Sequence, residues 1–435
     1  MMLKTADRSV SFEKNVPVAF ETQVLVVGSG PAGIAAAVHA ARQGVSVLLA
    51  EQSGVLGGTG VLAMVPEIMN FDDGEHFLAG GFGREVHDAL FGECHYTREW
   101  KNVRLEPLKR FYDEAVLSSG VRLLLYVRLT DVIKEADRLT YAVFSGQEGT
   151  FAVRAEQFID CTGNAFLASL AGAEWDFGNE ENVTMPATLA SLWGGVDFEK
   201  KKDDHKEILR AINDGVFSQY DTALPGIKKN YPEVGVGGGN VGHAFKVDDR
   251  YSETLTKATV DARKRLAEYE TYYRNYVEGC ENAVLLASAP WLGIRESKRI
   301  RCVSTLSAEH FSDGYLPPDL IGRYSYPVDI HPMTPDEKGM QNFQASVSLR
   351  HERGQNYGIP YGCLIPRGFE NLFTAGRCIG ADRVMQASAR VIPCCYITGQ
   401  AAGIAAALCE SEHCAAAELS YPLLREKLLK IGAYL

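Results

Sequence analysis

The stretch VVGSGPAG, residues 26–33, sets three glycines in the pattern G-x-G-x-x-G directly after an apolar run. Residues 23–27 predict a short buried strand, and the proline of the stretch favours the first turn of a helix that ends near Gly44. A second apolar run, residues 45–50, ends at Glu51. Strand, glycine turn, helix and strand make a βαβ unit, in which the turn and the helix N-terminus suit a pyrophosphate. The stretch therefore predicts an α/β fold of Rossmann-like type that binds a nucleotide.

Glu51 follows Gly28 by 23 residues, which is where an acidic residue accepts hydrogen bonds from ribose hydroxyls. A carboxylate in this position repels a 2′-phosphate, so NADP is disfavoured. The alternative is a glycine-rich turn without a ligand, and the presence of both strands, the helix and the acid argues against it.

Segments far from the first glycine turn favour FAD over NAD. QSGVLGGTG follows Glu51 directly, QFIDCTG at 157–163 runs from an apolar strand into a Thr-Gly turn, and residues 370–408 repeat this pattern before a helix of small residues. Three distant segments that converge on one nucleotide indicate a ligand with a far end that must also be held. We therefore expect the longer cofactor.

Seven motifs occur in order between residues 16 and 408: VPVAFETQVLVVGSGPAGIAAA, LGGTG, FIDCTGNAFLASLAGA, LGIRESKRI, YPVDIHP, IPYGCLIP and NLFTAGRCIGADR. This series resembles the FAD-dependent oxidoreductases of the glutathione-reductase-like superfamily, in the branch near the fumarate reductase and succinate dehydrogenase flavoproteins. Within that branch it is similar to a broad bacterial family. The resemblance implies a Rossmann-like FAD-binding domain of three layers, split over residues 20–175 and 356–415. It also implies an inserted α+β substrate domain at 176–355 and a C-terminal helical tail at 416–435.

The resemblance also implies the residues that contact FAD. No histidine occurs in GGTGVLAM, where the succinate dehydrogenase group attaches FAD covalently, so we expect the cofactor to be held non-covalently. The implied contacts are Gly28, Ser29, Gly30 and Gly33 at the pyrophosphate, Glu51 at the ribose, Gly58 and Thr59 at the middle of the cofactor, Leu129 at the adenine, Thr162 and Gly163 at the adenosine half, and Gly376 and Arg377 at the pyrophosphate and ribitol.

Three positions at or near these contacts differ from relatives or bear on the flavin. Asn164 and Arg377 stand where relatives often carry an acid, which changes a contact rather than the cofactor. Ile392 opens the last apolar helix, whose positive N-terminal end favours an anionic reduced flavin.

A substrate that gives a hydride to flavin N5 usually also loses a proton, so a base with a pKa near 7 is useful. His331 in YPVDIHP and His243 in VGHAF are the candidates, and the resemblance favours His331. The alternative for each is a structural histidine.

Arg295 and Arg299 in GIRESKRI, with Arg390 in ASARVIP, are candidates for holding an anionic or polyhydroxylated substrate, or for stabilising reduced flavin. Salt bridges between domains are the alternative role for these arginines.

A second G-x-G-x-x-G, with glycines at 237, 239 and 242, lacks a preceding long strand and a following βαβ unit. We interpret it as a glycine-rich loop that precedes a long polar helix over about residues 252–277. Without a pyridine-nucleotide domain, we expect electrons to reach the flavin from an organic substrate. The sequence thus predicts an FAD-dependent oxidoreductase that transfers a hydride between a small organic substrate and flavin N5. A flavin-dependent isomerase or lyase without net redox change, and a non-catalytic flavin-binding protein, remain open.

Composition limits which binding partners and which cellular compartment we expect for this chain. The chain has 44 Lys and Arg against 55 Asp and Glu, with the basic residues scattered, so we expect no nucleic-acid partner. The apolar stretch GIAAAL at 403–408 falls short of a membrane span, and we expect no membrane partner. Ten cysteines at irregular spacing, none in C-x-x-C form, predict reduced thiols in a cytoplasmic protein and no metal site. A homo-oligomer is possible.

Overall fold

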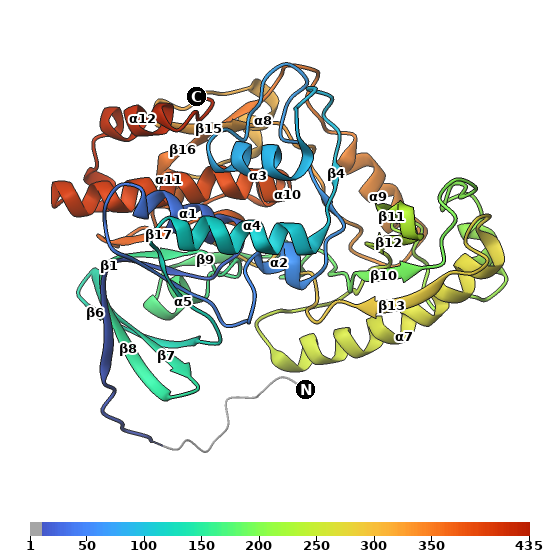
Figure 1. The fold of residues 1–435 in the computed structure, drawn as a ribbon, viewed down its shortest axis with the longest axis horizontal. Coiled ribbons are helices and arrows are strands. Elements are labelled where there is room, and N and C mark those ends of the chain that lie inside the picture. The colour runs from blue at the N-terminus through green and yellow to red at the C-terminus, as the bar shows by residue number, and fades with distance from the viewer. Residues whose placement is uncertain (1–10) are drawn as a thin grey trace.

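A computed structural model describes residues 11–435 as a mixed α/β fold built on a seven-stranded sheet (Figure 1). The sheet runs in the order β5-β2-β1-β8-β7-β6, and β17 also pairs with β8. The five strands β5, β2, β1, β8 and β17 are parallel, whereas β7 and β6 are antiparallel. The strands are β1 (Val18–Val27), β2 (Val47–Ala50), β5 (Arg122–Leu124), β6 (Arg128–Glu135), β7 (Arg138–Gly146), β8 (Gly149–Asp160) and β17 (Leu372–Thr374). The predicted Rossmann-like parallel core is confirmed.

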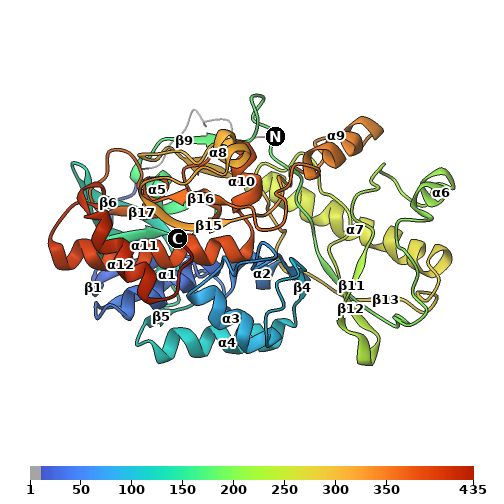
Figure 2. The same cartoon turned by 90° about the horizontal axis from the view of Figure 1, so that it is seen from above.

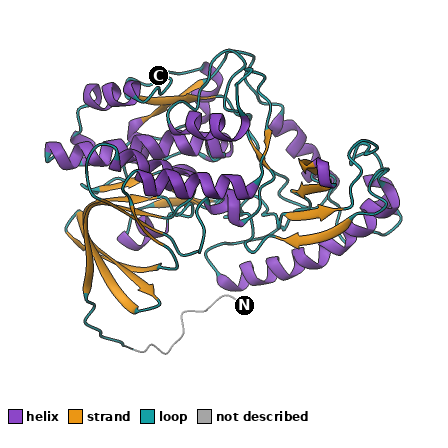
Figure 3. Cartoon of the chain, viewed as in Figure 1, coloured by secondary structure: helices purple, strands orange, loops and turns teal. Residues whose placement is uncertain are grey.

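The first strand separates two hydrophobic cores, because alternate side chains of a strand point to opposite faces. Val24 and Val26 join the core that contains α1 (Pro31–Ala41) and α11 (Ile392–Glu412). Leu25 and Val27 join a second core beneath the sheet, with β6, β7 and α5 (Phe166–Ala171). Figure 3 shows the antiparallel strands fanning away from the helical layer.

The helices α1 and α11 pack closely on the sheet because both carry small residues. A Cβ added to Gly399 or Gly403 would lie 2.1 Å from the backbone oxygen of Ala32 or Ala36, respectively. Close contact at these glycines therefore places the first half of α1 against the middle of α11. The helices around this core are α2 (Gly58–Leu62), α3 (Phe82–Phe91), α4 (Leu105–Ser118), α8 (Ala308–Asp313), α10 (Arg383–Ala389) and α12 (Tyr421–Lys430).

Helix α11 corrects one expectation from the sequence. It is 21 residues long with a mean hydropathy of 1.4, so its length and composition would allow it to cross a membrane. In the fold, 94% of its most apolar window is buried inside the protein. The apolar stretch is therefore longer than GIAAAL alone indicates, since Gly, Thr and Cys extend it, and it forms a core helix here.

A second sheet lies beside this layer, next to the long helix α7 (Ser252–Tyr276) (Figure 2). Its core includes Trp193 on the sheet and Tyr269, Tyr272 and Tyr273 on the helix, all buried. Two short helices complete the outer elements, α6 (Ile208–Asn213) and α9 (Glu337–Val347). The strand order is β11 (Ile227–Tyr231), β12 (Val236–Gly239), β10 (Ser191–Gly194) and β13 (Val284–Ser288).

The second glycine motif was wrongly predicted to be a loop throughout, because two of its three glycines, Gly237 and Gly239, lie in β12. A Cβ on Gly237 would lie 2.4 Å from the Lys228 backbone oxygen, and one on Gly239 would lie 2.6 Å from the Trp193 indole nitrogen. These glycines therefore allow close packing within the second sheet. The long polar helix predicted after them is confirmed as α7.

Residues inside the predicted insert also return to the main cores. The strand β14 (Lys298–Ile300) pairs with β9 (Trp175–Phe177), and β15 (Leu320–Tyr324) pairs with β16 (Tyr357–Pro360). Side chains of β15 pack in the same core as α11. The predicted domain boundaries, at 175/176, 355/356 and 415/416, stay a prediction. A two-stranded pair of β3 (Glu67–Ile68) and β4 (Lys101–Asn102) completes the described strands.

Candidate active site

The first glycine turn brings β1, α1 and the end of β8 into contact. Gly28 has φ +92°, and a Cβ there would lie 2.7 Å from the backbone oxygen of Cys161. A Cβ on Gly33 would lie 1.8 Å from the Gly28 oxygen. Both glycines are therefore required by the fold itself, as the fingerprint for close helix and strand packing predicts.

Gly30 is different, and it provides a test of whether the turn fits a ligand. Its φ of −65° is open to any residue, and a Cβ on it would meet nothing closer than the Cys161 oxygen at 4.0 Å. The protein's own packing therefore leaves space in front of Gly30. The first N–H groups of α1 have no intrahelical acceptors, which suits the pyrophosphate of a dinucleotide.

Glu51, at the end of β2, is buried and holds the same turn. Its carboxylate accepts the backbone N–H and the hydroxyl of Ser29, each at 2.8 Å, and the backbone N–H of Ser53 at 2.7 Å. The backbone around Glu51 also pairs with residues 126–127, because Val127 donates to the Glu51 oxygen at 3.0 Å. Leu129 instead pairs with Phe144 across the hairpin, two residues beyond this contact.

Segments at Gly58, Thr162, Gly163 and Gly376 converge on the first turn, as the spacing of the motifs indicates. Gly57 donates its N–H to the Ser29 oxygen at 2.8 Å, and a Cβ on Gly58 would lie 2.7 Å from the Gly30 Cα. Gly376 has φ +78°, and a Cβ on it would lie 3.0 Å from Ala32. Thr59 is exposed at the start of α2, and Ile392 begins α11.

The Thr-Gly turn after β8 is organised by Asp160. This buried carboxylate accepts the N–H and hydroxyl of Thr162, at 2.9 and 2.7 Å, and the N–H of Ala168 at 2.8 Å. The Thr162 hydroxyl also accepts the Phe166 N–H. Burial raises the pKa of Asp160.

Arg377 connects three segments. Its Nε donates to the Gly163 oxygen at 2.7 Å, and its Nη1 donates to the backbone oxygen of Ile294. Burial lowers the pKa of this guanidinium. Its predicted contact with the cofactor stays a prediction.

The two candidate histidines lie in direct contact, although 88 residues separate them. His243 Nε2 and His331 Nδ1 are 2.7 Å apart. The outer nitrogens face carboxylates: His243 Nδ1 lies 3.0 and 3.1 Å from the two oxygens of Asp221, and His331 Nε2 lies 3.3 Å from Asp329 Oδ2. Asp329 continues the chain, because it accepts Arg390 Nη2 at 2.8 Å.

Sequence reasoning missed both carboxylates. Asp329 lies inside the quoted motif YPVDIHP, two residues before His331. This spacing could have indicated that the two side chains lie close together. Asp221 lies in a loop 22 residues before His243, and no local pattern marks it. The Asp221 carboxylate also accepts the backbone N–H of His243 at 2.7 Å, which fixes the ring opposite the carboxylate.

Burial and neighbouring charge set the protonation of this chain of side chains, called here the histidine–carboxylate chain (Asp221, His243, His331, Asp329 and Arg390). Burial and then the charge of Arg295 lower the pKa of His331 to about 3. Burial opposes the ionisation of Asp329, but its His331 and arginine neighbours outweigh this and hold its pKa well below the usual range. Burial also opposes the ionisation of Asp221, and His243 outweighs it, so its pKa is lowered.

Arg295 lies beside this chain with few partners. It donates to the Pro186 oxygen at 2.8 Å and to Asn240 Oδ1 at 3.3 Å. Among the described side chains, no carboxylate lies within ion-pair distance of it. Burial, and then the charge of Arg390, lower its pKa to about 9. The third candidate arginine, Arg299, instead forms a buried ion pair with Glu296 at 3.0 Å.

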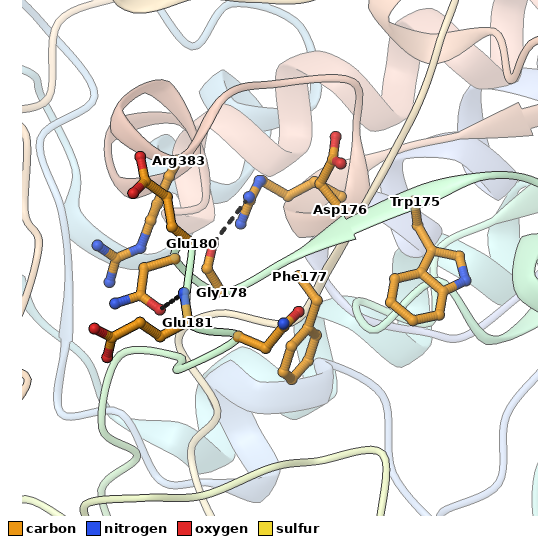
Figure 4. Close-up of a pocket in the computed structure, with 10 residues that line it drawn as sticks. Trp175, Asp176, Phe177, Gly178, Glu180, Glu181 and Arg383 are labelled. Carbon is orange, nitrogen blue, oxygen red and sulfur yellow. Dashed lines mark hydrogen bonds between the residues drawn. The ribbon is translucent and has the colours of Figure 1, made fainter.

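A cavity of about 640 Å³ lies next to Arg299, and Figure 4 shows its lining. Arg383 reaches it and also pairs with Glu296 at 3.0 Å. Of the residues singled out from the sequence, Arg299 alone lines this cavity. The lining residues are Trp175, Asp176, Phe177, Gly178, Asn179, Glu180, Glu181, Asn182, Arg299 and Arg383.

A protein-family model covers nearly the whole chain. A family model described as FAD dependent oxidoreductase matches residues 23–428. That range contains all the predicted cofactor contacts and the histidine–carboxylate chain.

Individual relatives match only in part. A dihydrolipoyl dehydrogenase of Haloferax volcanii is 26% identical over 190 residues, which make up 41% of this chain and 38% of that protein. A thiamine thiazole synthase of Desulfosudis oleivorans is 29% identical over 204 residues, 44% of this chain and 72% of that protein. The match thus spans little more than a third of the dehydrogenase. A crystal structure of a geranylgeranyl bacteriochlorophyll reductase-like protein from Thermoplasma acidophilum aligns with a TM-score of 0.45 at 13% identity, over 95% of this chain and 83% of that one.

Proposed function

Since the chain belongs to the FAD-dependent oxidoreductase family, we propose that it transfers a hydride between a small organic substrate and FAD while His331 exchanges a proton with that substrate. The observation that carries the proposal is the position of His331. This ring is buried in direct contact with a second histidine and a carboxylate, with Arg295 as a close cationic neighbour. A ring held only by packing does not need this set of polar partners.

The residues that would hold FAD are those around the first glycine turn. The outward N–H groups and the free space at Gly30 suit the pyrophosphate, and Glu51 suits the adenosine ribose. Gly58, Thr162 and Gly376 lie against this turn or the start of α1. We propose that binding is non-covalent. When bound, FAD takes up or releases the hydride at N5.

The atom that we assign to proton exchange is His331 Nε2. Its contact with Asp329 is the longest of the three that join the rings and carboxylates, at 3.3 Å. A substrate hydroxyl or amine that replaces Asp329 at this nitrogen has a hydrogen-bond partner there, while Nδ1 stays in contact with His243. In the oxidation direction, the hydroxyl proton passes to Nε2 as the carbon loses its hydride, and a carbonyl forms.

Arg295 and Arg390 orient the substrate in this proposal. Arg295 lacks an ion-pair partner among the described side chains, and Arg390 Nε is buried without a hydrogen bond. Both guanidiniums therefore have donors free for oxygen atoms of the substrate. We further propose that the substrate binds between the FAD-binding part and the predicted insert, because His243 and His331 come from residues within that insert.

The experiment is an anaerobic titration of the purified holoenzyme with sugars, hydroxy acids, amines and dicarboxylates. A substrate of the proposed kind bleaches the absorbance of oxidised flavin and yields product in equal amount. A compound that is converted while the flavin stays oxidised, with no electron acceptor present, would instead assign an isomerase or a lyase. The proposed relation to the fumarate reductase branch predicts that dicarboxylates are among the reacting compounds.

A further inference from the structure

We propose that His243 and His331 hold three protons between them and exchange protons with the substrate as one unit, with Asp221 fixing the positive charge on His243. This rests on the proposed function in one respect only, namely that the substrate meets the pair at His331. The proton count itself follows from hydrogen-bond geometry in the enzyme without substrate.

The count begins at the two ends of the pair. An ionised carboxylate only accepts hydrogen bonds, so a nitrogen that faces it must carry a hydrogen. His243 Nδ1 faces both oxygens of Asp221, at 3.0 and 3.1 Å, and His331 Nε2 faces Asp329 Oδ2 at 3.3 Å. Each outer nitrogen therefore holds one proton.

The inner contact needs a third proton. At 2.7 Å, His243 Nε2 and His331 Nδ1 are at hydrogen-bond distance, and such a bond needs one donor and one acceptor. If each ring held one proton, one of the three contacts would set two lone pairs against each other. Two rings with three protons carry a single positive charge, which the two flanking carboxylates stabilise.

The third proton does not reside on a carboxylate, because both carboxylates also accept hydrogen bonds from other donors. Asp221 accepts the backbone N–H of His243 at 2.7 Å and that of Ala223 at 3.1 Å. Asp329 accepts Arg390 Nη2 at 2.8 Å, in an ion pair whose side chains are nearly buried. These donors favour the ionised form of both residues.

The neighbours decide which ring carries the charge. The charge of Arg295 disfavours a second positive charge on His331, whereas His243 has Asp221 directly at its outer nitrogen. Arg265 donates to the backbone oxygen of His243 rather than to its ring. The charge therefore lies on His243. The titratable and charged groups around the pair are Asp221, Asp329, Arg295, Arg390, Arg265, Tyr326 and Tyr269.

This arrangement gives His243 a role in the reaction. When a substrate hydroxyl replaces Asp329, the proton on His331 Nε2 is released to water as the substrate binds, and the inner proton moves from His243 Nε2 to His331 Nδ1. The pair then holds two protons, and His331 Nε2 accepts the hydrogen of the substrate hydroxyl. The proton then taken up at Nε2 is balanced by transfer of the inner proton from His331 Nδ1 to His243 Nε2. The positive charge forms beside Asp221, away from Arg295. In the reduction direction the same steps run in reverse, and His331 Nε2 donates.

The test is nitrogen NMR of the holoenzyme labelled with ¹⁵N in its histidine rings, without substrate and at neutral pH. His243→Gln and His331→Gln assign the two sets of signals. The expected spectrum has both His243 nitrogens protonated and His331 protonated at one nitrogen. Two singly protonated rings at neutral pH would overturn the proposal, whatever the outcome of the substrate titration.

Asp221→Asn supplies the second measurement, because an asparagine amide can donate to His243 Nδ1 and removes the need for the third proton. In this variant we expect the pair to lose its proton at a pH lower by at least about one unit, a tenfold change. Asp203→Asn is the control, since Asp203 faces His205 at 3.3 Å on the surface. Equal titration of the wild type and both variants would contradict the proposal. If Asp221→Asn fails to fold, the wild-type spectrum alone decides.

Discussion

The carboxylate of Glu51 accepts both the backbone N–H and the hydroxyl of Ser29, each at 2.8 Å. An acid at the end of the second strand of a βαβ unit is expected to bind ribose. Here it also joins that strand to the first glycine turn. If Glu51 also binds the ribose as proposed, folding of the turn and binding of the cofactor depend on the same side chain.

Glu51→Gln is expected to weaken both the folded glycine turn and the binding of FAD. The amide keeps one acceptor oxygen but loses the charge and one acceptor, and hydrogen bonds to a charged group contribute about 1.5–3 kcal/mol each. We expect the Kd for FAD to rise at least about tenfold and the melting temperature of the FAD-free protein to fall. Fluorescence titration and thermal unfolding measure these. Glu135→Gln, at an exposed position of β6, is the control. An unchanged melting temperature would show that the contacts to Ser29 contribute nothing to the fold.

Substitutions at Gly30 and Gly33 are expected to have different effects: one weakens FAD binding and the other weakens the stability of the FAD-free protein. Gly33→Ala sets a Cβ 1.8 Å from a backbone oxygen, which cannot move aside cheaply, so the FAD-free protein is expected to lose stability. The Cβ of Gly30→Ala has the Cys161 oxygen at 4.0 Å as its nearest neighbour, so we expect little change in the FAD-free protein but much weaker FAD binding. Chemical denaturation and FAD titration of both variants check this. Equal effects of the two variants on stability would count against the site.

His39 is expected to make the fold sensitive to acid. This residue of α1 is buried with no hydrogen bond at either ring nitrogen, and burial lowers its pKa to about 4. Because the folded-state pKa lies below that of the unfolded chain, near 6.5, the unfolded state binds the proton first as the pH falls. Stability from the neutral ring is therefore complete above about pH 6.5 and is lost down to about pH 4, a loss of roughly 3 kcal/mol.

His39→Leu removes this contribution, and denaturation curves at pH 7 and pH 5 measure it. We expect the difference in unfolding free energy between the two pH values to be smaller in the variant. His205→Leu, at an exposed ring, is the control and should change little. The same pH dependence in His39→Leu and the wild type would show that His39 is not the group responsible.

The sequence predicted the parts of the site that local pattern determines. Alternating apolar residues, the glycines of residues 26–33 and Glu51 identify a βαβ unit because each depends on neighbours within one supersecondary element. The apolar runs before Thr162 and Gly376 likewise indicate strand ends that meet at one sheet edge.

Other features depend on contacts between distant segments. His243 and His331 were each candidates, but their 2.7 Å contact depends on how two loops 88 residues apart meet. Asp221 has no local motif. The glycines of β12 resembled a loop in the sequence. A glycine is needed there because a larger residue would collide with Trp193 on another strand, and periodicity within one segment does not reveal such a contact.

The most direct test of the account is the rate at which a reacting substrate reduces the bound flavin, measured by anaerobic rapid mixing for the wild type and His331→Gln. With FAD content unchanged, we expect the variant to be slower by about 10²–10⁴-fold, the usual contribution of a proton-transferring side chain. Flavin reduction at the wild-type rate in His331→Gln would contradict the central claim, because the reaction would then proceed without the side chain to which the account assigns the proton.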